Sequence, residues 1–454
     1  MKKLIYNCAI LITKATSALI KLVHAGAGTN LPGRIARRIA PDILSHLINQ
    51  SKKEIIVVTG TNGKTTTSGF VAGILRQDGR KTAHNKRGAN MLSGLTAAMI
   101  QESSLNGYLN ADHCLLEIDE AFFVKAVDEF NPEYLIVTNL FRDQLDRYGE
   151  LDTTAKKIKQ AIAKTISIKP LTLVLNADDP NVAALGDNFE LKKVYYGFNE
   201  VEFVNQEGKI TAPAEVAACS CGEKYNYSKI FYGHLGHYYC NCGKSRQQPE
   251  IIASVKVEPE SSILNISSKN QGEFKVKINM PGLYNAYNAL AAISLSLELG
   301  ISKEIIIVGL ENYSTVFGRA ELTYLKGMPT MIQLIKNPIG ATEVLRTVKD
   351  DPKSRMLIII NDNYADGRDV SWLWDANFEL LSGYKKLVVT SGVRASDMAV
   401  RLKYAGISKE NIKPIENIKN AIDYSLKQLE EGEKLYILPT YTALLEMQGI
   451  LGNY

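Results

Sequence analysis

The chain has 454 residues with little net charge, no internal repeat and no low-complexity tract. Its 53 basic and 48 acidic residues leave a formal charge of only +5, too small an excess to indicate a nucleic-acid partner. With 45% apolar and 22% charged residues, the composition argues against a disordered or fibrous chain. The length predicts two or three globular domains.

Long apolar runs are also missing. The first 28 residues combine a basic start with an apolar stretch, as a secretory signal does, but Lys14 and Lys21 interrupt that stretch. The remaining runs are too short to span a bilayer. An amphipathic helix is predicted instead, which either packs on the following domain or touches the membrane surface.

Cysteines are few, and most of them lie close together. Cys8 and Cys114 are isolated, whereas the other four form two CxC pairs, each followed by glycine. This pattern favours metal binding in a reducing compartment over a disulfide framework. Four thiolates fit a tetrahedral structural Zn²⁺ site of the ribbon type, with free thiols as the alternative and with His234 and His237 as possible substitute ligands. The candidate zinc ligands are Cys219, Cys221, Cys240 and Cys242.

Short apolar runs alternate with segments long enough for crossover helices. The first four runs lie at 54–58, 114–118, 134–138 and 171–176. Such alternation predicts a mainly parallel sheet with helices on both faces. Between about 201 and 278 the pattern changes to short alternating strands and turns, which suggests an insertion.

The alternating pattern then returns and predicts a second, smaller α/β domain. Its apolar runs lie at 331–335, 356–360, 386–390 and 435–438. The expected domains are an N-terminal helical segment (1–50), a central ATP-binding domain (51–318) with a zinc-ribbon insertion at about 216–246, and a C-terminal α/β domain (319–454).

A glycine-rich loop, GTNGKTT at 60–66, follows the first predicted strand and opens a helix expected at 65–77. Backbone N–H groups of such a loop and the positive end of the helix dipole bind phosphate oxygens. The Lys64 side chain would reach the β and γ phosphates, and the Thr65 hydroxyl would bind Mg²⁺. The predicted nucleotide-binding residues here are Gly60, Thr61, Asn62, Gly63, Lys64, Thr65 and Thr66.

This loop resembles that of the Mur ligases and the folylpolyglutamate synthetases. Five further segments resemble the family in the same order, namely LEID at 116–119, TNLFRDQLD at 138–146, LNADDP at 175–180, NAYNALAA at 285–292 and GRAE at 318–321. The resemblance implies a Mur ligase-like phosphate-loop domain. It also implies a reaction in which ATP activates a carboxylate as an acyl phosphate, which an amine then attacks.

The resemblance implies roles for individual residues. Glu117 would bind Mg²⁺ together with Thr65, and Arg319 would meet the ATP phosphates at the hinge between domains. We expect the remaining nucleotide contacts from Asn176, Asn288 and Asn337. The alternative for Glu117 is a surface carboxylate at a strand end. The alternative for Asn288 is an amide that packs a helix, and for Arg319 it is a structural salt bridge.

Two departures from ordinary Mur ligases affect the expected substrate and metal. About fifty residues precede the phosphate loop, where that family has a UDP-binding domain, so we expect the substrate not to be held through UDP. Gln144 replaces the histidine of the family's DHLD segment, which favours one Mg²⁺ ion over two.

The cysteine-bearing insertion, Lys336-Asn337-Pro338 and the segment ADGRDVSWLWD at 365–375 resemble one branch of the family over essentially the whole chain. This branch is formed by the synthetase subunits of lipid II isoglutaminyl synthases. The resemblance implies a GatD-type glutaminase partner, whose catalytic triad is completed by an aspartate of this chain. Of the three aspartates in this region we select Asp369; the alternative is a capped loop with Asp369 or Ser371 at a helix N-terminus. The other two candidates are Asp362 and Asp366.

The predicted function is therefore that of an ATP-dependent synthetase subunit. It would amidate the α-carboxylate of D-glutamate in lipid II with ammonia from the partner, in the cytoplasm at the inner membrane face. The chain shows no convincing Cys-His pair for glutamine hydrolysis, which agrees with a separate ammonia source. A free-standing amino-acid ligase is one alternative, and a catalytically degenerate nucleotide-binding regulator or scaffold is another.

Overall fold

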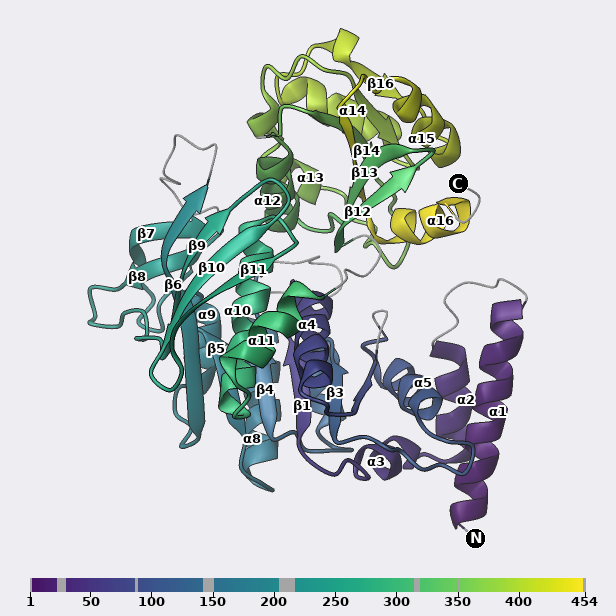
Figure 1. The fold of residues 1–454 in the computed structure, drawn as a ribbon, viewed down its shortest axis with the longest axis vertical. Coiled ribbons are helices and arrows are strands. Elements are labelled where there is room, and N and C mark those ends of the chain that lie inside the picture. The colour runs from purple at the N-terminus through teal and green to yellow at the C-terminus, as the bar shows by residue number, and fades with distance from the viewer. Residues whose placement is uncertain are drawn as a thin grey trace.

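The computed structural model describes residues 2–22, 30–85, 89–141, 151–203, 217–313, 319–349 and 351–451. Two α/β units are stacked along the long axis of the molecule, and a group of helices flanks the lower unit (Figure 1). Helix α1 (Lys2–Leu22) packs against α2 (Asn30–Ile39) at this flank, and α3 (Ile43–Ile48) and α5 (Leu92–Glu102) complete the group.

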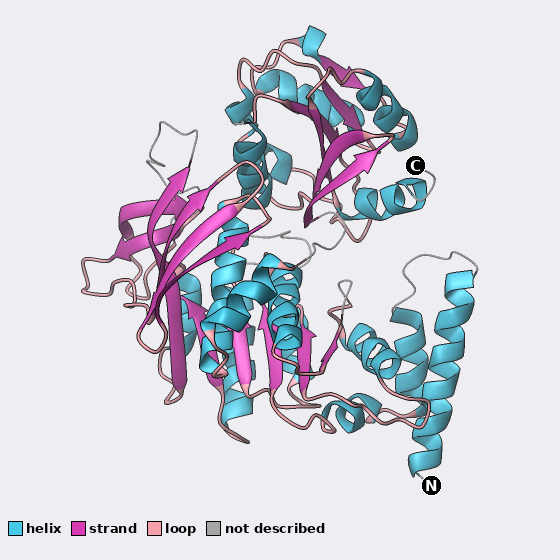
Figure 2. Ribbon diagram, viewed as in Figure 1, coloured by secondary structure: helices cyan, strands magenta, loops and turns pink. Residues whose placement is uncertain are grey.

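The lower unit is built on a nine-stranded sheet in the order β11-β10-β9-β6-β5-β4-β1-β3-β2 (Figure 2). The seven strands from β2 to β9 in this order run parallel to one another. At one edge, β10 pairs antiparallel with β9, and β11 pairs antiparallel with β10. The predicted parallel sheet is therefore confirmed. The strands are β1 (Ile55–Thr59), β2 (Thr82–His84), β3 (His113–Glu117), β4 (Tyr134–Val137), β5 (Thr172–Asn176), β6 (Lys192–Phe203), β9 (Ile251–Val257), β10 (Ser262–Ser268) and β11 (Gly272–Ile278).

Helices cover both faces of this sheet because successive residues of a buried strand point to opposite sides. In β1, Ile56 and Val58 join the apolar cluster under α4 and α10, whereas Ile55 and Val57 join the cluster formed with the N-terminal helices, α6 and α8. The helices of this unit are α4 (Lys64–Gln77), α6 (Glu120–Ala126), α8 (Leu151–Ile166), α9 (Pro180–Ala183) with the 3₁₀ turn Ala184–Gly186, α10 (Leu283–Glu298) and α11 (Lys303–Glu311).

The region from 201 to 278 divides into two parts, which corrects the expectation of a single insertion. Strands β9 to β11 continue the main sheet, since β9 pairs in parallel with β6. Only β7 (Asn226–Tyr232) and β8 (Leu235–Tyr239) form a separate two-stranded hairpin, and the four clustered cysteines lie at its open end. Apolar and polar residues alternate along β9 to β11 because this edge of the sheet is buried on one face only. An inserted sheet that is buried on one face would show the same alternation.

The upper unit is a six-stranded sheet in the order β12-β13-β17-β14-β15-β16. Its strands are β12 (Arg319–Leu325), β13 (Met328–Gln333), β14 (Ser354–Ile359), β15 (Val388–Ser391), β16 (Ile412–Pro414) and β17 (Lys434–Pro439). The helices are α12 (Pro338–Lys349), α13 (Trp372–Asp375), α14 (Ala395–Tyr404), α15 (Ile418–Lys427) and α16 (Tyr441–Leu451), with 3₁₀ turns at Phe378–Leu381 and Lys409–Asn411. The predicted second α/β domain is confirmed, and Figure 1 shows α12 on the side that faces the lower unit.

Candidate active site between the two α/β units

The phosphate loop joins β1 to α4, and its two glycines cannot carry a side chain. Gly60 has φ +126° and Gly63 has φ +85°, a region that residues with a Cβ rarely adopt. A Cβ at position 60 would lie 2.3 Å from Thr138 Oγ1, and one at position 63 would lie 2.0 Å from Asn288 Oδ1. Both backbone conformation and space therefore require glycine here.

Asn139, at the end of β4, holds the loop from below. Its side-chain oxygen accepts a hydrogen bond from the Asn62 N–H (2.9 Å), and its side-chain nitrogen donates to the Asn62 carbonyl (3.1 Å). The Thr61 N–H donates to the Asn139 carbonyl at 2.9 Å. The sequence prediction missed this residue. The signals available were its place in the TNLFRDQLD segment and its position directly after the apolar run at 134–138, at the same sheet edge as the loop.

Lys64 is the first residue of α4, and its ammonium group is nearly enclosed. Its Nζ donates to the Gly60 carbonyl at 2.5 Å and lies 3.1 Å from Glu120 Oε2. The two side chains are only 11% and 7% exposed. Glu120 begins α6 and was not predicted. In this position it keeps the lysine charge paired beside the loop, and phosphate oxygens would have to compete for the same ammonium group.

Glu117 ends β3 beside the loop and is 3% exposed. The Asn85 amide holds its backbone, since it accepts from the Glu117 N–H and donates to the Glu117 carbonyl, both at 2.8 Å. The buried Glu117 Oε2 has no hydrogen-bond partner within the part of the chain that the structure describes. A buried carboxylate oxygen is costly unless it meets a cation. Together with the hydroxyl of Thr65, the donor set suits Mg²⁺.

A cavity that is partly open to solvent lies directly above the loop. Walls are contributed by the loop and α4, by α10, by the hairpin β7–β8 and by the segment from β13 to α12 of the upper unit. The lining residues are Asn62, Gly63, Thr66, Asn139, Tyr232, Tyr284, Asn285, Asn288, Gln333, Leu334, Lys336, Gly340 and Val344. Its position, next to the loop and between the units, suits a nucleotide whose phosphates meet the loop.

Hydrogen bonds from Asn337 and Lys336 connect the upper unit to the phosphate loop. The side-chain nitrogen of Asn337 donates to Asn62 Oδ1 (3.0 Å), and Lys336 Nζ donates to the Thr61 carbonyl (2.9 Å). Asn337 is 1% exposed and also accepts the N–H of Gly340 in the first turn of α12. The structure thus brings predicted residue Asn337 to the loop, although 275 positions separate it from Asn62.

Three predicted nucleotide contacts lie in different surroundings. Asn288 lines the cavity opposite Gly63. Asn176 is fully buried, and its side chain binds backbone groups. Its oxygen accepts the Asp178 N–H (3.0 Å), and its nitrogen lies 3.5 Å from the Thr138 carbonyl. Its nucleotide role stays a prediction. Arg319 begins β12 opposite Gln333, a cavity residue, but its side chain lies outside the described part, as does Gln144.

The aspartates of the LNADDP segment have a structural role that the sequence prediction did not assign. Asp178 accepts hydrogen bonds from Arg246 Nε (2.6 Å), the Tyr287 hydroxyl (2.8 Å) and the Phe198 N–H (2.8 Å). Burial raises the pKa of Asp178, and the Arg246 guanidinium opposes that rise. This carboxylate therefore ties β6 and α10 to the segment that follows the cysteines.

The four cysteines form the predicted cluster. Their sulfur atoms all lie within 4.8 Å of one another, with one pair just before β7 and the other just after β8, at the open end of the hairpin. Cys219 and Cys242 are 3.6 Å apart, and Cys221 and Cys240 are 3.5 Å apart. Four thiolates at this spacing fit a closed tetrahedral Zn²⁺ site, which has no open position for catalysis.

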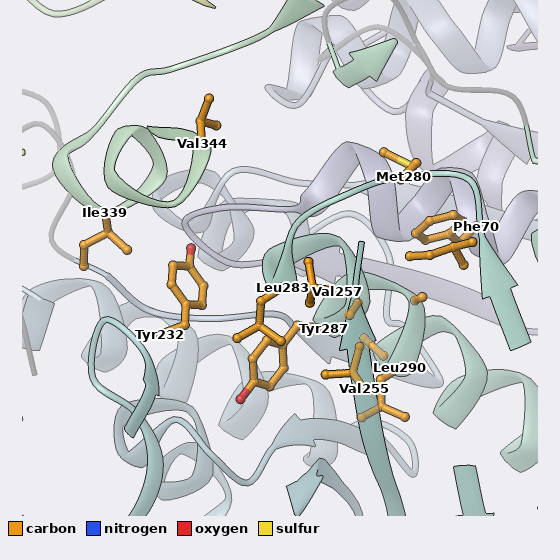
Figure 3. Close-up of a cluster of buried hydrophobic side chains, with 14 of the residues drawn as sticks. Phe70, Tyr232, Val255, Val257, Met280, Leu283, Tyr287, Leu290, Ile339 and Val344 are labelled. Carbon is orange, nitrogen blue, oxygen red and sulfur yellow. The ribbon is translucent and has the colours of Figure 1, made fainter. Parts of the chain in front are cut away.

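The closed end of the same hairpin reaches the active site. The Tyr232 ring lies 5.1 Å from the ring of Phe141 and lines the cavity, and Figure 3 shows it beside Ile339 and Leu283. His234 is 1% exposed, and its Nε2 lies 3.0 Å from Asp179 Oδ1. The hairpin therefore joins the cysteine cluster at one end to the cavity wall at the other.

Removing the cysteine cluster is expected to weaken nucleotide binding. An isolated two-stranded hairpin is only marginally stable, so the metal that ties its open end should also hold Tyr232 in place. We expect Cys221→Ser with Cys242→Ser to lose bound zinc, to melt at least about 5 °C lower and to bind ATP about tenfold more weakly.

Zinc content, thermal melting and ATP titration measure these three effects separately. Cys8→Ser is the matched control, because Cys8 is also exposed but lies far along the chain from the cluster. Unchanged zinc content would contradict the ligand assignment. Zinc loss with unchanged ATP affinity would contradict the coupling to Tyr232.

The three candidate aspartates of the upper unit differ in their surroundings. Asp362 pairs with Arg394 (2.6 Å), and Asp366 is 5% exposed and accepts the Thr442 N–H at 2.7 Å. Burial raises the pKa of Asp366, against hydrogen bonds from Thr442. Asp369 is exposed, and one of its oxygens accepts the Ser371 N–H at 2.8 Å.

Hydrogen bonds from the Ser371 side chain and backbone lower the pKa of Asp369, so its carboxylate stays charged at neutral pH. The geometry thus agrees with the selection of Asp369 as the aspartate that a partner can reach. Ser371 occupies the N-cap position of α13 without a side-chain cap, and Asp369 instead accepts the Ser371 N–H in the turn before the helix.

A phosphate loop at the carboxyl edge of a parallel sheet, closed by a second α/β unit, defines a Mur ligase. The family description "Mur ligase middle domain" matches residues 58–296, and "MurT ligase C-terminal" matches residues 334–444. A Mur ligase fold implies ATP as the nucleotide.

The comparison with known proteins gives the particular family. The chain is 36% identical to the lipid II isoglutaminyl synthase (glutamine-hydrolyzing) subunit MurT of Staphylococcus aureus, over 97% of this chain and 95% of that protein. It is 35% identical to the MurT subunit of Streptococcus pneumoniae, over 95% and 94%. The solved structure of a pseudomurein peptide ligase type C from Methanothermus fervidus matches with a TM-score of 0.67 and 25% identity, over 91% of this chain and 80% of that one. The chain belongs to the family of MurT subunits of lipid II isoglutaminyl synthase.

Proposed function

We propose that this chain is the ATP-dependent synthetase subunit of a glutamine-hydrolysing lipid II isoglutaminyl synthase, and that it acts in peptidoglycan synthesis. It converts the α-carboxylate of D-glutamate in the stem peptide to the amide of D-isoglutamine. The observation that carries the proposal is the cavity between the units in a chain that belongs to the MurT family. Asn62 of the phosphate loop lines this cavity, and Asn337 of the upper unit is hydrogen-bonded to Asn62.

A carboxylate must be activated before ammonia can attack it. Transfer of the γ-phosphoryl group of ATP to a carboxylate oxygen gives an acyl phosphate and ADP. Ammonia then attacks the carbonyl carbon, the phosphate leaves with the electron pair of the C–O bond, and the nitrogen loses a proton. The chain needs no side-chain nucleophile for either step, because catalysis consists of positioning and charge neutralisation.

The residues of the site divide this work. Lys64 and the N–H groups of the loop neutralise and orient the phosphates. We assign to Arg319, at the hinge between the units, a further part in neutralising the phosphate charge. Glu117 and Thr65 would hold Mg²⁺, which supplies further positive charge beside the phosphates when bound. Asn337 and Lys336 hold the upper unit against the loop, so that the site is complete only when the two units meet.

We assign the ammonia source to a separate glutaminase subunit of the GatD type. The name of the relatives describes one subunit of a glutamine-hydrolysing enzyme. On this chain, exposed aromatic side chains flank Asp369 or lie nearby in the upper unit, with Tyr364 84%, Trp374 56% and Tyr404 72% exposed. Aromatic side chains of this kind are enriched at protein interfaces. Since the substrate is lipid-linked, we place the reaction in the cytoplasm at the inner face of the membrane.

The test is mass analysis of the stem peptide after incubation of the chain with lipid II and MgATP. One reaction receives glutamine and a glutaminase partner, and the other receives ammonium. Both should show the small mass decrease that follows when a carboxyl OH becomes NH₂. An unchanged peptide, together with a mass gain when amino acids are supplied, would instead indicate a free-standing amino-acid ligase.

A further inference from the structure

Helix α1 exposes an unbroken apolar stripe. The exposed fractions are 69% for Leu4, 50% for Leu11, 44% for Ile12 and 61% for Leu19, and Cys8, Ala15 and Ala18 are exposed between them. Positions 4, 8, 11, 12, 15, 18 and 19 lie on one face of a helix. In the part of α1 whose side chains are described, no charged residue interrupts this stripe.

The opposite face of α1 is attached to the protein. Tyr6, Ala9 and Ile10 belong to the apolar core of the N-terminal helices. Lys14 Nζ donates to the Ser103 carbonyl at 2.5 Å, and the Thr13 side chain is fully buried. By length and composition α1, alone among the described helices, could cross a membrane, which corrects the expectation that its apolar runs are too short. A helix fixed along one face lies on a surface rather than through a bilayer.

The positive charge of the chain is concentrated in the same region. Residues 1–41 contain seven lysines and arginines and no aspartate or glutamate, which gives +7. The remaining residues contain 46 basic and 48 acidic side chains, which gives −2, so the net +5 arises entirely from this segment. Two of its charges are paired, Arg37 with Glu129 and Lys2 with Asp42. Lys3, Arg34 and Arg38 are exposed.

We propose that α1 is a docking surface for a membrane that contains anionic lipids, with its apolar stripe in the headgroup region and the exposed cations of α1 and α2 attracted to the lipid charges. A second copy of the chain is a poorer occupant of the stripe, because pairing α1 with itself would bring two strongly basic segments together. Figure 1 shows α1 at the outer edge of the molecule, away from the upper unit, where a flat surface could reach it. The proposal does not rest on the proposed reaction, since lipid binding requires neither ATP nor glutamine.

The test is co-sedimentation of the full chain with vesicles of phosphatidylcholine, with and without phosphatidylglycerol. Binding is expected on the anionic vesicles only and should weaken as salt rises. Ile12→Glu, in the stripe, should reduce the bound fraction about tenfold or more. Ile168→Glu is the matched control, because Ile168 is 65% exposed outside α1. Thermal melting of each variant shows that the fold is intact.

Three results would overturn the proposal. The first is absence of binding to anionic vesicles, and the second is an equal loss of binding in Ile12→Glu and Ile168→Glu. The third is a dimer in solution that Ile12→Glu dissociates, with no vesicle binding by the unchanged chain. That result would assign the stripe to a second copy. Amidation of soluble substrate analogues should be unaffected by Ile12→Glu, so the fate of this proposal and that of the proposed reaction can be told apart.

Discussion

Lys64→Ala is expected to lower amide formation at least about a thousandfold, with both glutamine and ammonium as the nitrogen source. The Lys64 ammonium is the charge that the loop presents to the phosphates, and it lies in a nearly dry site, where an electrostatic contact is strongest. Its loss also leaves Glu120 as an unpaired carboxylate beside the phosphates, which adds repulsion to the lost attraction.

The measurement is the single-turnover rate of ADP and amide formation with lipid II. Lys164→Ala is the control, since Lys164 pairs with Asp128 at 2.7 Å but is 48% exposed on α8. Circular dichroism and thermal melting establish that the Lys64 variant folds. Full activity in a folded Lys64→Ala protein would contradict the assignment of the loop to ATP.

Asp369→Asn is expected to depress glutamine-dependent amidation at least about a hundredfold and to leave amidation from ammonium nearly unchanged. The exposed carboxylate would orient the histidine of the partner glutaminase and stabilise its imidazolium form. An asparagine keeps the size and can still accept the Ser371 N–H, so the turn before α13 should persist. The charge alone is removed.

The comparison of the two nitrogen sources locates the effect. Asp375→Asn is the matched control, because Asp375 is also exposed and lies six residues further along the same segment. Equal loss with glutamine and with ammonium would move Asp369 into the synthetase site or into folding. Loss of partner binding, measured by titration calorimetry, would indicate that Asp369 contributes to assembly rather than to the triad.

Signals that are local in the sequence proved the most informative. The phosphate loop was recognisable because glycine, lysine and threonine must follow a strand and open a helix in a fixed order, and the structure gives Gly60 and Gly63 the conformations that require glycine. The cysteine cluster could also be predicted, because the cysteines of each pair are close in sequence. Four thiolates typically bind a structural Zn²⁺ ion. Strands β1, β3, β4 and β5 followed from their continuous apolar runs.

Signals were weakest where a local pattern has two explanations. Alternating apolar and polar residues from 251 to 278 fit either an inserted hairpin region or the edge of the main sheet, and only the pairing of β9 with β6 distinguishes them. In the same way, an aspartate before a short helix fits both a cap and a partner's triad, as Asp369 does.

The sequence by itself determined the order of the motifs along the chain, the phosphate loop, the cysteine cluster and the family. Each of these depends on residues that are close in sequence or on a motif that tolerates little change. The tertiary structure alone decided which distant side chains complete the site. Glu120 meets Lys64 across 56 positions, Tyr232 enters the cavity from the cysteine hairpin, and Asn337 meets Asn62 across 275 positions. Such contacts arise from the packing of whole elements, and no periodicity or spacing within one segment records them.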